Sequence, residues 1–155
     1  MKPLLVGESN PYQVDPRLAQ RFALYPDPLG CAGWRLCHKV MQLDQADYLA
    51  RFDRVNLCNG KWSVHEARRR ADDLSRGSDS ERTYVLFGAK VSSVFGWLLN
   101  REDFKPFTRH EETAYVYERP RSYVILPHPG GLSRAWNEPG AFERARRVLR
   151  EAGVL

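Results

Sequence analysis

The chain has 155 residues, of which 43% are hydrophobic and 28% are charged, and its formal net charge is +5. The length favours a single domain spanning residues 1–155 with its own core, and the composition argues against a disordered or fibrous protein. The positive charge is carried mostly by arginine, which suits phosphate recognition, but charge alone does not indicate nucleic-acid binding.

The cysteines, the histidines and the apolar runs argue against several further classes of protein. Three cysteines without a C-x-x-C pair argue against a disulfide framework and against a four-cysteine metal site. The four histidines lack metal-ligand spacing, so we expect no metal. We find neither a secretory h-region nor an apolar stretch long enough to cross a bilayer, and therefore expect a cytoplasmic, monomeric protein without a membrane partner.

The first part of the chain reads as one strand followed by three helices. The expected strand covers residues 3–7 and leads into a polar turn, and the expected helices cover residues 16–24, 32–43 and 45–52. Asp15 and Pro16 have the character of a helix start, and residues 25–30 read as a loop.

The second part alternates strands and helices. Strands are expected at residues 53–58, 83–87 and 123–126, and helices at residues 63–77, 90–99 and 139–152. Ser63 and Glu66 form a capping-box pattern at the start of the first of these helices. Residues 100–113 look irregular, and residues 115–117 fit either an edge strand or extended chain.

This order predicts a three-layer α/β/α fold around a central, mainly parallel four-stranded sheet. In such sheets ligands bind beyond the carboxyl ends of the strands, and three polar residues are expected there: Asn10, Asn56 and His128. Because no glycine-rich phosphate loop is present, we expect no nucleotide cofactor, and no other cofactor is indicated.

The last expected strand ends in a distinctive loop. Pro127 and Pro129 fix the backbone around His128, and Gly130 and Gly131 allow positive φ angles or close approach to another molecule. The pattern indicates a loop that presents side chains to a partner.

Four segments, in chain order, resemble the motifs of the uracil-DNA glycosylase superfamily. Residues 7–12 resemble its water-positioning turn, residues 54–57 its base-reading strand, residues 85–90 the following strand and helix entry, and residues 128–134 its last loop. The resemblance covers most of the chain. It implies a cofactor-free enzyme of base excision repair that flips uracil, or a related damaged pyrimidine, out of DNA and hydrolyses its N-glycosidic bond.

The resemblance also implies roles for individual residues. His128 would donate a hydrogen bond to the departing base, Asn10 would orient the attacking water, and Asn56 would match O4 and N3–H of uracil. Tyr12 would exclude the methyl group of thymine, and Tyr25 would stack on the base.

The last loop would contact DNA. Leu132 would fill the gap left by the flipped nucleotide, and Arg134 would reach a phosphate or the opposite strand. Gly130, Gly131 and Ser133 complete the expected DNA contacts, although Gly130 stands where loops of the superfamily usually carry a phosphate-binding serine.

The sequence alone leaves alternatives open for the water-binding residue and for the function. Aligned on Pro11, the first motif makes Asn10 the water-positioning residue, whereas aligned on Gly7 it makes Glu8 the water-binding carboxylate, as in the iron–sulfur branch of the superfamily. The cysteines of that branch are absent. The same fold could also serve a glycosylase for another mismatched, deaminated or modified base, or a DNA-binding member without turnover.

Overall fold

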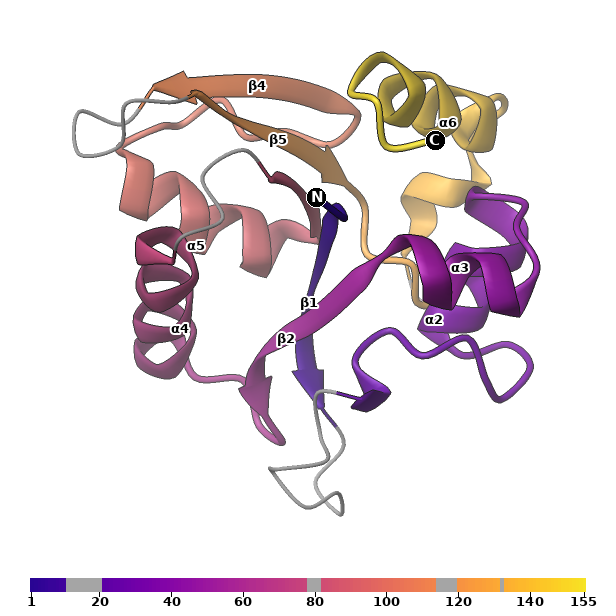
Figure 1. The fold of residues 1–155 in the computed structure, drawn as a ribbon, viewed down its shortest axis with the longest axis horizontal. Coiled ribbons are helices and arrows are strands. Elements are labelled where there is room, and N and C mark those ends of the chain that lie inside the picture. The colour runs from indigo at the N-terminus through magenta and orange to yellow at the C-terminus, as the bar shows by residue number, and fades with distance from the viewer. Residues whose placement is uncertain (11–20, 78–81, 114–119, 132) are drawn as a thin grey trace.

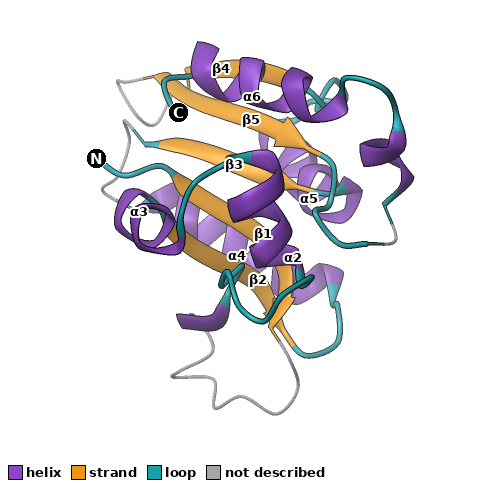
Figure 2. Ribbon diagram, turned by 90° about the vertical axis from the view of Figure 1, so that its right-hand side faces the viewer, coloured by secondary structure: helices purple, strands orange, loops and turns teal. Residues whose placement is uncertain are grey.

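The computed structural model describes residues 1–10, 21–77, 82–113, 120–131 and 133–155. At its centre is a five-stranded sheet with the strand order β2-β1-β3-β5-β4 (Figure 2). The strands are β1 (Leu4–Asn10), β2 (Asp53–Asn59), β3 (Thr83–Phe87), β4 (Thr108–Thr113) and β5 (Pro120–Leu126). Four of them run parallel, and β4 pairs antiparallel with β5 at one edge.

Helices cover both faces of this sheet (Figure 1). On one face lie α4 (Val64–Arg76) and α5 (Ala89–Leu99), and on the other lie α2 (Ala32–Trp34), the π-helical turn η1 (Arg35–Val40), α3 (Gln45–Arg51) and α6 (Ala141–Glu151). Successive strand residues point to opposite faces, so Leu4 and Val6 join the core under α4 and α5, while Leu5 joins the core on the other side.

Several expected elements are confirmed. Ser63 caps α4, since its hydroxyl accepts a hydrogen bond from the backbone N–H of Glu66 at 3.3 Å. The closing helix buries the apolar side chains of Ala145, Val148 and Leu149, which its 3–4 spacing placed on one face. None of the helices in the described segments has the length and apolar character needed to cross a bilayer.

The expectation of four strands was wrong, because the sheet has five. The additional strand, β4, lies within residues 100–113, which we expected to be irregular. Its sequence, TRHEET, lacks apolar alternation, since an edge strand pairs through its backbone and can carry polar side chains on both faces. The possible strand at residues 115–117 and most of the expected helix at residues 16–24 lie outside the described residues. The expected helix at residues 32–43 is a short α-helical turn followed by η1.

Candidate functional site

The candidate site lies at the carboxyl edge of the parallel strands. A cavity of about 440 Å³ opens there, and its wall includes Glu8 of β1, Asn56 of β2 and His128 just after β5. β1 has β2 on one side and β3 on the other, so the direction in which strands are added reverses at β1. Open α/β sheets bind their ligands at such a switch point.

Gly88 allows two of these side chains to converge. It follows β3 directly and has a φ angle of +92°, which side-chain-bearing residues rarely adopt. A Cβ atom at this position would lie 3.2 Å from Cβ of His128 and 3.3 Å from Oε1 of Glu8. Glu8 and His128 therefore flank the same bare stretch of backbone. Lys90 approaches from the start of α5, with its Nζ 3.9 Å from Oε2 of Glu8.

The ring of His128 has a defined hydrogen-bonding state. The backbone N–H of Gly130 donates to Nδ1 at 2.9 Å, so in the neutral ring Nδ1 is the acceptor and the proton resides on Nε2. Within the described part of the chain Nε2 has no hydrogen-bond partner. A Cβ atom on residue 130 would lie 2.7 Å from Nδ1, so this placement of the ring requires a glycine at residue 130.

The loop that carries His128 is also held by a hydrogen bond from a residue that follows it in the chain. The indole Nε1 of Trp136 donates to the backbone oxygen of His128 at 2.8 Å. Trp136 lies in η2 (Arg134–Asn137) and stacks on Phe142 of α6, with ring centroids 5.4 Å apart. The histidine is thus fixed both by its own loop and by the closing helix.

Asn10 lies at the end of β1, as expected, but is not among the described residues that line this cavity. Its side chain is only 4% exposed and is bonded to two other asparagines, Asn56 at 2.7 Å and Asn59 at 2.8 Å. Among the residues described, Glu8 and Asn56 line the cavity with His128, whereas Asn10 lies behind Asn56 and lines a separate polar hollow. Of the two residues that the first motif offers for one role, Glu8 is therefore the one that lines this cavity.

Two aromatic side chains stand in the cavity wall. Tyr25 is there as expected, with the guanidinium of Arg54 5.5 Å from its ring centroid. Phe22 contacts Tyr25 edge to face and is 49% exposed. Tyr12 and Leu132, the expected methyl-excluding residue and wedge, lie outside the described residues.

A second, smaller hollow borders the outside of the His128 loop. It measures about 250 Å³ and contains Arg35 and Lys39 of η1 together with Gly131 and Ser133. A Cβ atom on Gly131 would lie 3.1 Å from Nη1 of Arg35, so the guanidinium packs against the loop backbone. Arg134 is exposed on η2 next to it. Nothing in the sequence singled out Arg35 or Lys39, because only the fold brings η1 beside this loop.

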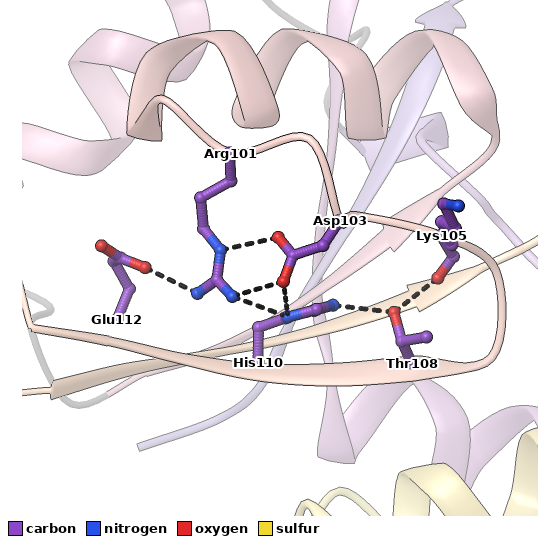
Figure 3. Close-up of polar contacts among 6 residues, drawn as sticks. All are labelled: Arg101, Asp103, Lys105, Thr108, His110 and Glu112. Atoms are coloured by element: carbon purple, nitrogen blue, oxygen red, sulfur yellow. Dashed lines mark hydrogen bonds and ion pairs between the residues drawn. The ribbon is translucent and has the colours of Figure 1, made fainter.

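A cluster of ionisable residues between α5 and β4 has a different character (Figure 3). Arg101 bridges two carboxylates, with Asp103 and Glu112 each 2.7 Å from its guanidinium. Its Nη2 also lies 3.2 Å from Nδ1 of His110, and Nε2 of His110 lies 2.8 Å from the hydroxyl of Thr108. The hydrogen bond from Arg101 lowers the pKa of Asp103 to about 2.

Comparison with known proteins adds no assignment: no family model and no curated protein matches this chain.

Proposed function

We propose that this protein is a DNA glycosylase of the uracil-DNA glycosylase superfamily, which excises uracil or a closely related pyrimidine from DNA as part of base excision repair. The observation that carries the proposal is the meeting of Glu8, Asn56 and His128 in one cavity at the carboxyl edge of the sheet. These three side chains supply a carboxylate, an amide and a hydrogen-bond donor, which suit the water, the base edge and the departing base respectively.

His128 would stabilise the departing base. Cleavage of the N-glycosidic bond leaves negative charge on the pyrimidine, and a fixed donor aimed at its O2 lowers the barrier as an oxyanion hole does. The hydrogen bond from Gly130 leaves the proton of the neutral ring on Nε2, the nitrogen that has no hydrogen-bond partner among the described residues. The imidazole is therefore preorganised to donate.

Glu8 would hold the attacking water. A carboxylate can accept both hydrogen bonds and a proton, whereas the amide of asparagine can accept hydrogen bonds only. Its negative charge would also favour the positive charge that develops on the sugar. Asn10, whose amide is already bonded to two neighbours, is less suited to the same task.

Asn56 would read the base, and the aromatic side chains of the wall would stack on it. The Asn56 amide offers an acceptor for N3–H and a donor for O4 of uracil. The cavity size falls within the range of small-molecule sites, roughly 300–1,000 Å³. Aromatic contact with a flipped base is worth about 1–3 kcal/mol in comparable proteins.

Arg35 and Lys39 support the DNA partner. Neither forms an ion pair with a carboxylate among the described residues, and both lie beside Gly131 and Ser133. Cations in this position can bind the phosphates that flank the flipped nucleotide, which would compensate for the missing serine at residue 130.

The test is release of uracil from labelled oligonucleotides, single-stranded and opposite A or G, with thymine and 5-hydroxymethyluracil as comparison bases. We expect the wild type to release uracil and Glu8→Gln to lower the rate by about 100-fold or more. Glu111→Gln, which changes an exposed carboxylate on β4, is the matched control and keeps the wild-type rate.

Other outcomes would contradict the proposal. Release of another base in place of uracil would move the assignment to a different glycosylase of this fold. Salt-dependent DNA binding without release of any base would indicate a binding protein. A Glu8→Gln variant at the wild-type rate would refute the role of the carboxylate.

A further inference from the structure

The orientation of one amide decides which pyrimidine the proposed site can read. Uracil offers a donor at N3 and an acceptor at O4, whereas cytosine offers an acceptor at N3 and a donor at N4. An asparagine matches uracil in one orientation and cytosine after a 180° flip of its amide. Any residue that locks the amide of Asn56 therefore contributes to selectivity.

Three asparagines of β1 and β2 form a continuous chain of hydrogen bonds. Nδ2 of Asn56 donates to Oδ1 of Asn10 at 2.7 Å, and Nδ2 of Asn10 donates to Oδ1 of Asn59 at 2.8 Å. The pairing of the two strands places them together, since Asn10 is in register with Asn59 and Gly7 with Asn56. We call these three side chains the asparagine relay.

Both hydrogen bonds of the relay run in the same direction, each amide nitrogen donating to the next asparagine from Asn56 toward Asn59. If Asn56 alone flipped, its Oδ1 would face the Oδ1 of Asn10, and two acceptors would meet without a proton. Only a simultaneous flip of all three amides would restore the bonds. The backbone at the outer end is held as well, because the N–H of Asn59 donates to Oε1 of Glu66 in α4 at 3.4 Å.

Gly7 leaves room for the side chain at the inner end of the relay, Asn56. A Cβ atom on Gly7 would lie 2.3 Å from Oδ1 of Asn56 and 3.3 Å from Cγ of Leu24, a residue of the cavity wall. The oxygen of Asn56 therefore lies over the bare backbone of Gly7, next to a side chain of the cavity wall. Its nitrogen lies on the side of Asn10.

We propose that Asn10 and Asn59 act as specificity-determining positioning residues, which hold Asn56 in the orientation that accepts a hydrogen bond from N3–H of a 4-oxopyrimidine. This inference rests on the proposed function and deepens it. It gives Asn10 a task that its burial and two hydrogen bonds support, in place of contact with the water.

The experiment compares binding to three duplexes that differ at one position: an abasic analogue, 2′-fluoro-deoxyuridine and 2′-fluoro-deoxycytidine, whose glycosidic bonds resist cleavage. We expect Asn10→Leu to reduce the preference for uracil over cytosine by about tenfold, the equivalent of roughly one lost hydrogen bond. Affinity for the abasic duplex stays at the wild-type value, because no base reaches Asn56 there. A general structural defect would weaken all three.

Two further variants keep the test decisive. Asn10→Asp retains an acceptor for Nδ2 of Asn56, so its preference stays within about threefold of wild type. Asn59 is exposed, so Asn59→Ala tests the relay without altering the core, and we expect a smaller loss of about threefold.

Different results would overturn the asparagine relay and the proposed function. A wild-type preference for uracil that survives in folded Asn10→Leu, or in Asn59→Ala, would overturn the relay and leave the proposed function standing. A wild type that neither releases uracil nor prefers it over cytosine would overturn the proposed function, and the specificity role with it.

Discussion

His128 and His110 are both held by hydrogen bonds, yet within the described segments only His128 retains a ring nitrogen without a hydrogen-bond partner. Around His110, Nδ1 faces the guanidinium of Arg101, and Nε2 faces the hydroxyl of Thr108, which itself donates to the backbone oxygen of Lys105. Both ring nitrogens are occupied (Figure 3). At His128 the amide of Gly130 occupies Nδ1 alone.

The neighbouring carboxylates differ in the same way. Asp103 and Glu112 share one arginine at short range, whereas the ion pair that Glu8 forms in the described part of the chain is with Lys90 at 3.9 Å. The α5–β4 cluster thus pairs its charges internally and ties the edge strand to the segment that follows α5. Residue types alone do not distinguish a site from such a cluster. The difference lies in hydrogen-bonding capacity that is left unused at the wall of a cavity.

The largest effect is expected from the histidine with the unused donor. His128→Ala is expected to lower the rate of uracil release by about 100- to 1,000-fold, the usual cost of removing one donor to a developing anion. His110→Gln, in the α5–β4 cluster around Arg101, is expected to keep the wild-type rate. Single-turnover base release measures both. Equal losses in the two variants would remove the distinction between the two histidines.

A smaller effect is expected from the glycine that sets the tautomer. In Gly130→Ala the new Cβ would lie 2.7 Å from Nδ1 of His128, so the ring has to move and its hydrogen bond to the loop is lost. We expect a rate loss on the order of tenfold, equal to about one hydrogen bond. Gly77→Ala is the control, because its Cβ would make only an ordinary 3.5 Å contact. An unchanged rate in Gly130→Ala would show that Nδ1 needs no fixed partner.

The cations beside the loop should affect binding more than chemistry. Arg35→Gln is expected to reduce the slope of log affinity against log salt concentration by about one for an abasic duplex, with a few-fold weaker binding. Arg51→Gln removes an exposed arginine of α3 at the opposite end of β2, and its slope stays unchanged. Titrations at several salt concentrations give both values. Identical slopes for Arg35→Gln and wild type would place the phosphate path elsewhere.

Much of the fold was predictable because its signals are local. The apolar runs of β3 and β5, the cap of α4 and the apolar stripe of α6 each lie within a few consecutive residues. The edge strand β4 was not predictable, because its pairing depends on the backbone of β5 and its side chains are polar.

The site was predictable in part for the same reason. The expected convergence of Asn56 and His128 follows from strand order, since both belong to carboxyl ends of parallel strands. Sequence alone did not show that Asn10 would bond to Asn59 while Glu8 lines the cavity, because a contact between residues 10 and 59 leaves no local pattern. Arg35 was likewise hidden, because η1 reaches the His128 loop only through the packing of the whole layer.

The smallest effect is expected at His110, whose ring nitrogens both have hydrogen-bond partners, and it concerns the stability of the fold. Burial lowers the pKa of His110 below its ordinary value of about 6.5, and this outweighs the opposing attraction of Asp103. The unfolded chain therefore binds this proton at a higher pH than the folded chain does. Between the two pKa values the unfolded state holds more protons, so the stability that depends on neutral His110 is complete above about pH 6.5 and declines as the pH falls toward the folded pKa.

Replacing His110 by glutamine removes this titration. We expect the unfolding free energy of His110→Gln, measured in urea, to change less between about pH 7.5 and about pH 5.5 than that of the wild type. His65→Gln alters an exposed histidine on α4 and keeps the wild-type dependence. A His110→Gln protein as pH-sensitive as the wild type would mean that the ring accepts its proton in the folded cluster. In that case the neighbouring carboxylates, and not burial, would control His110, and the contrast with His128 would lie in charge as well as in hydrogen bonding.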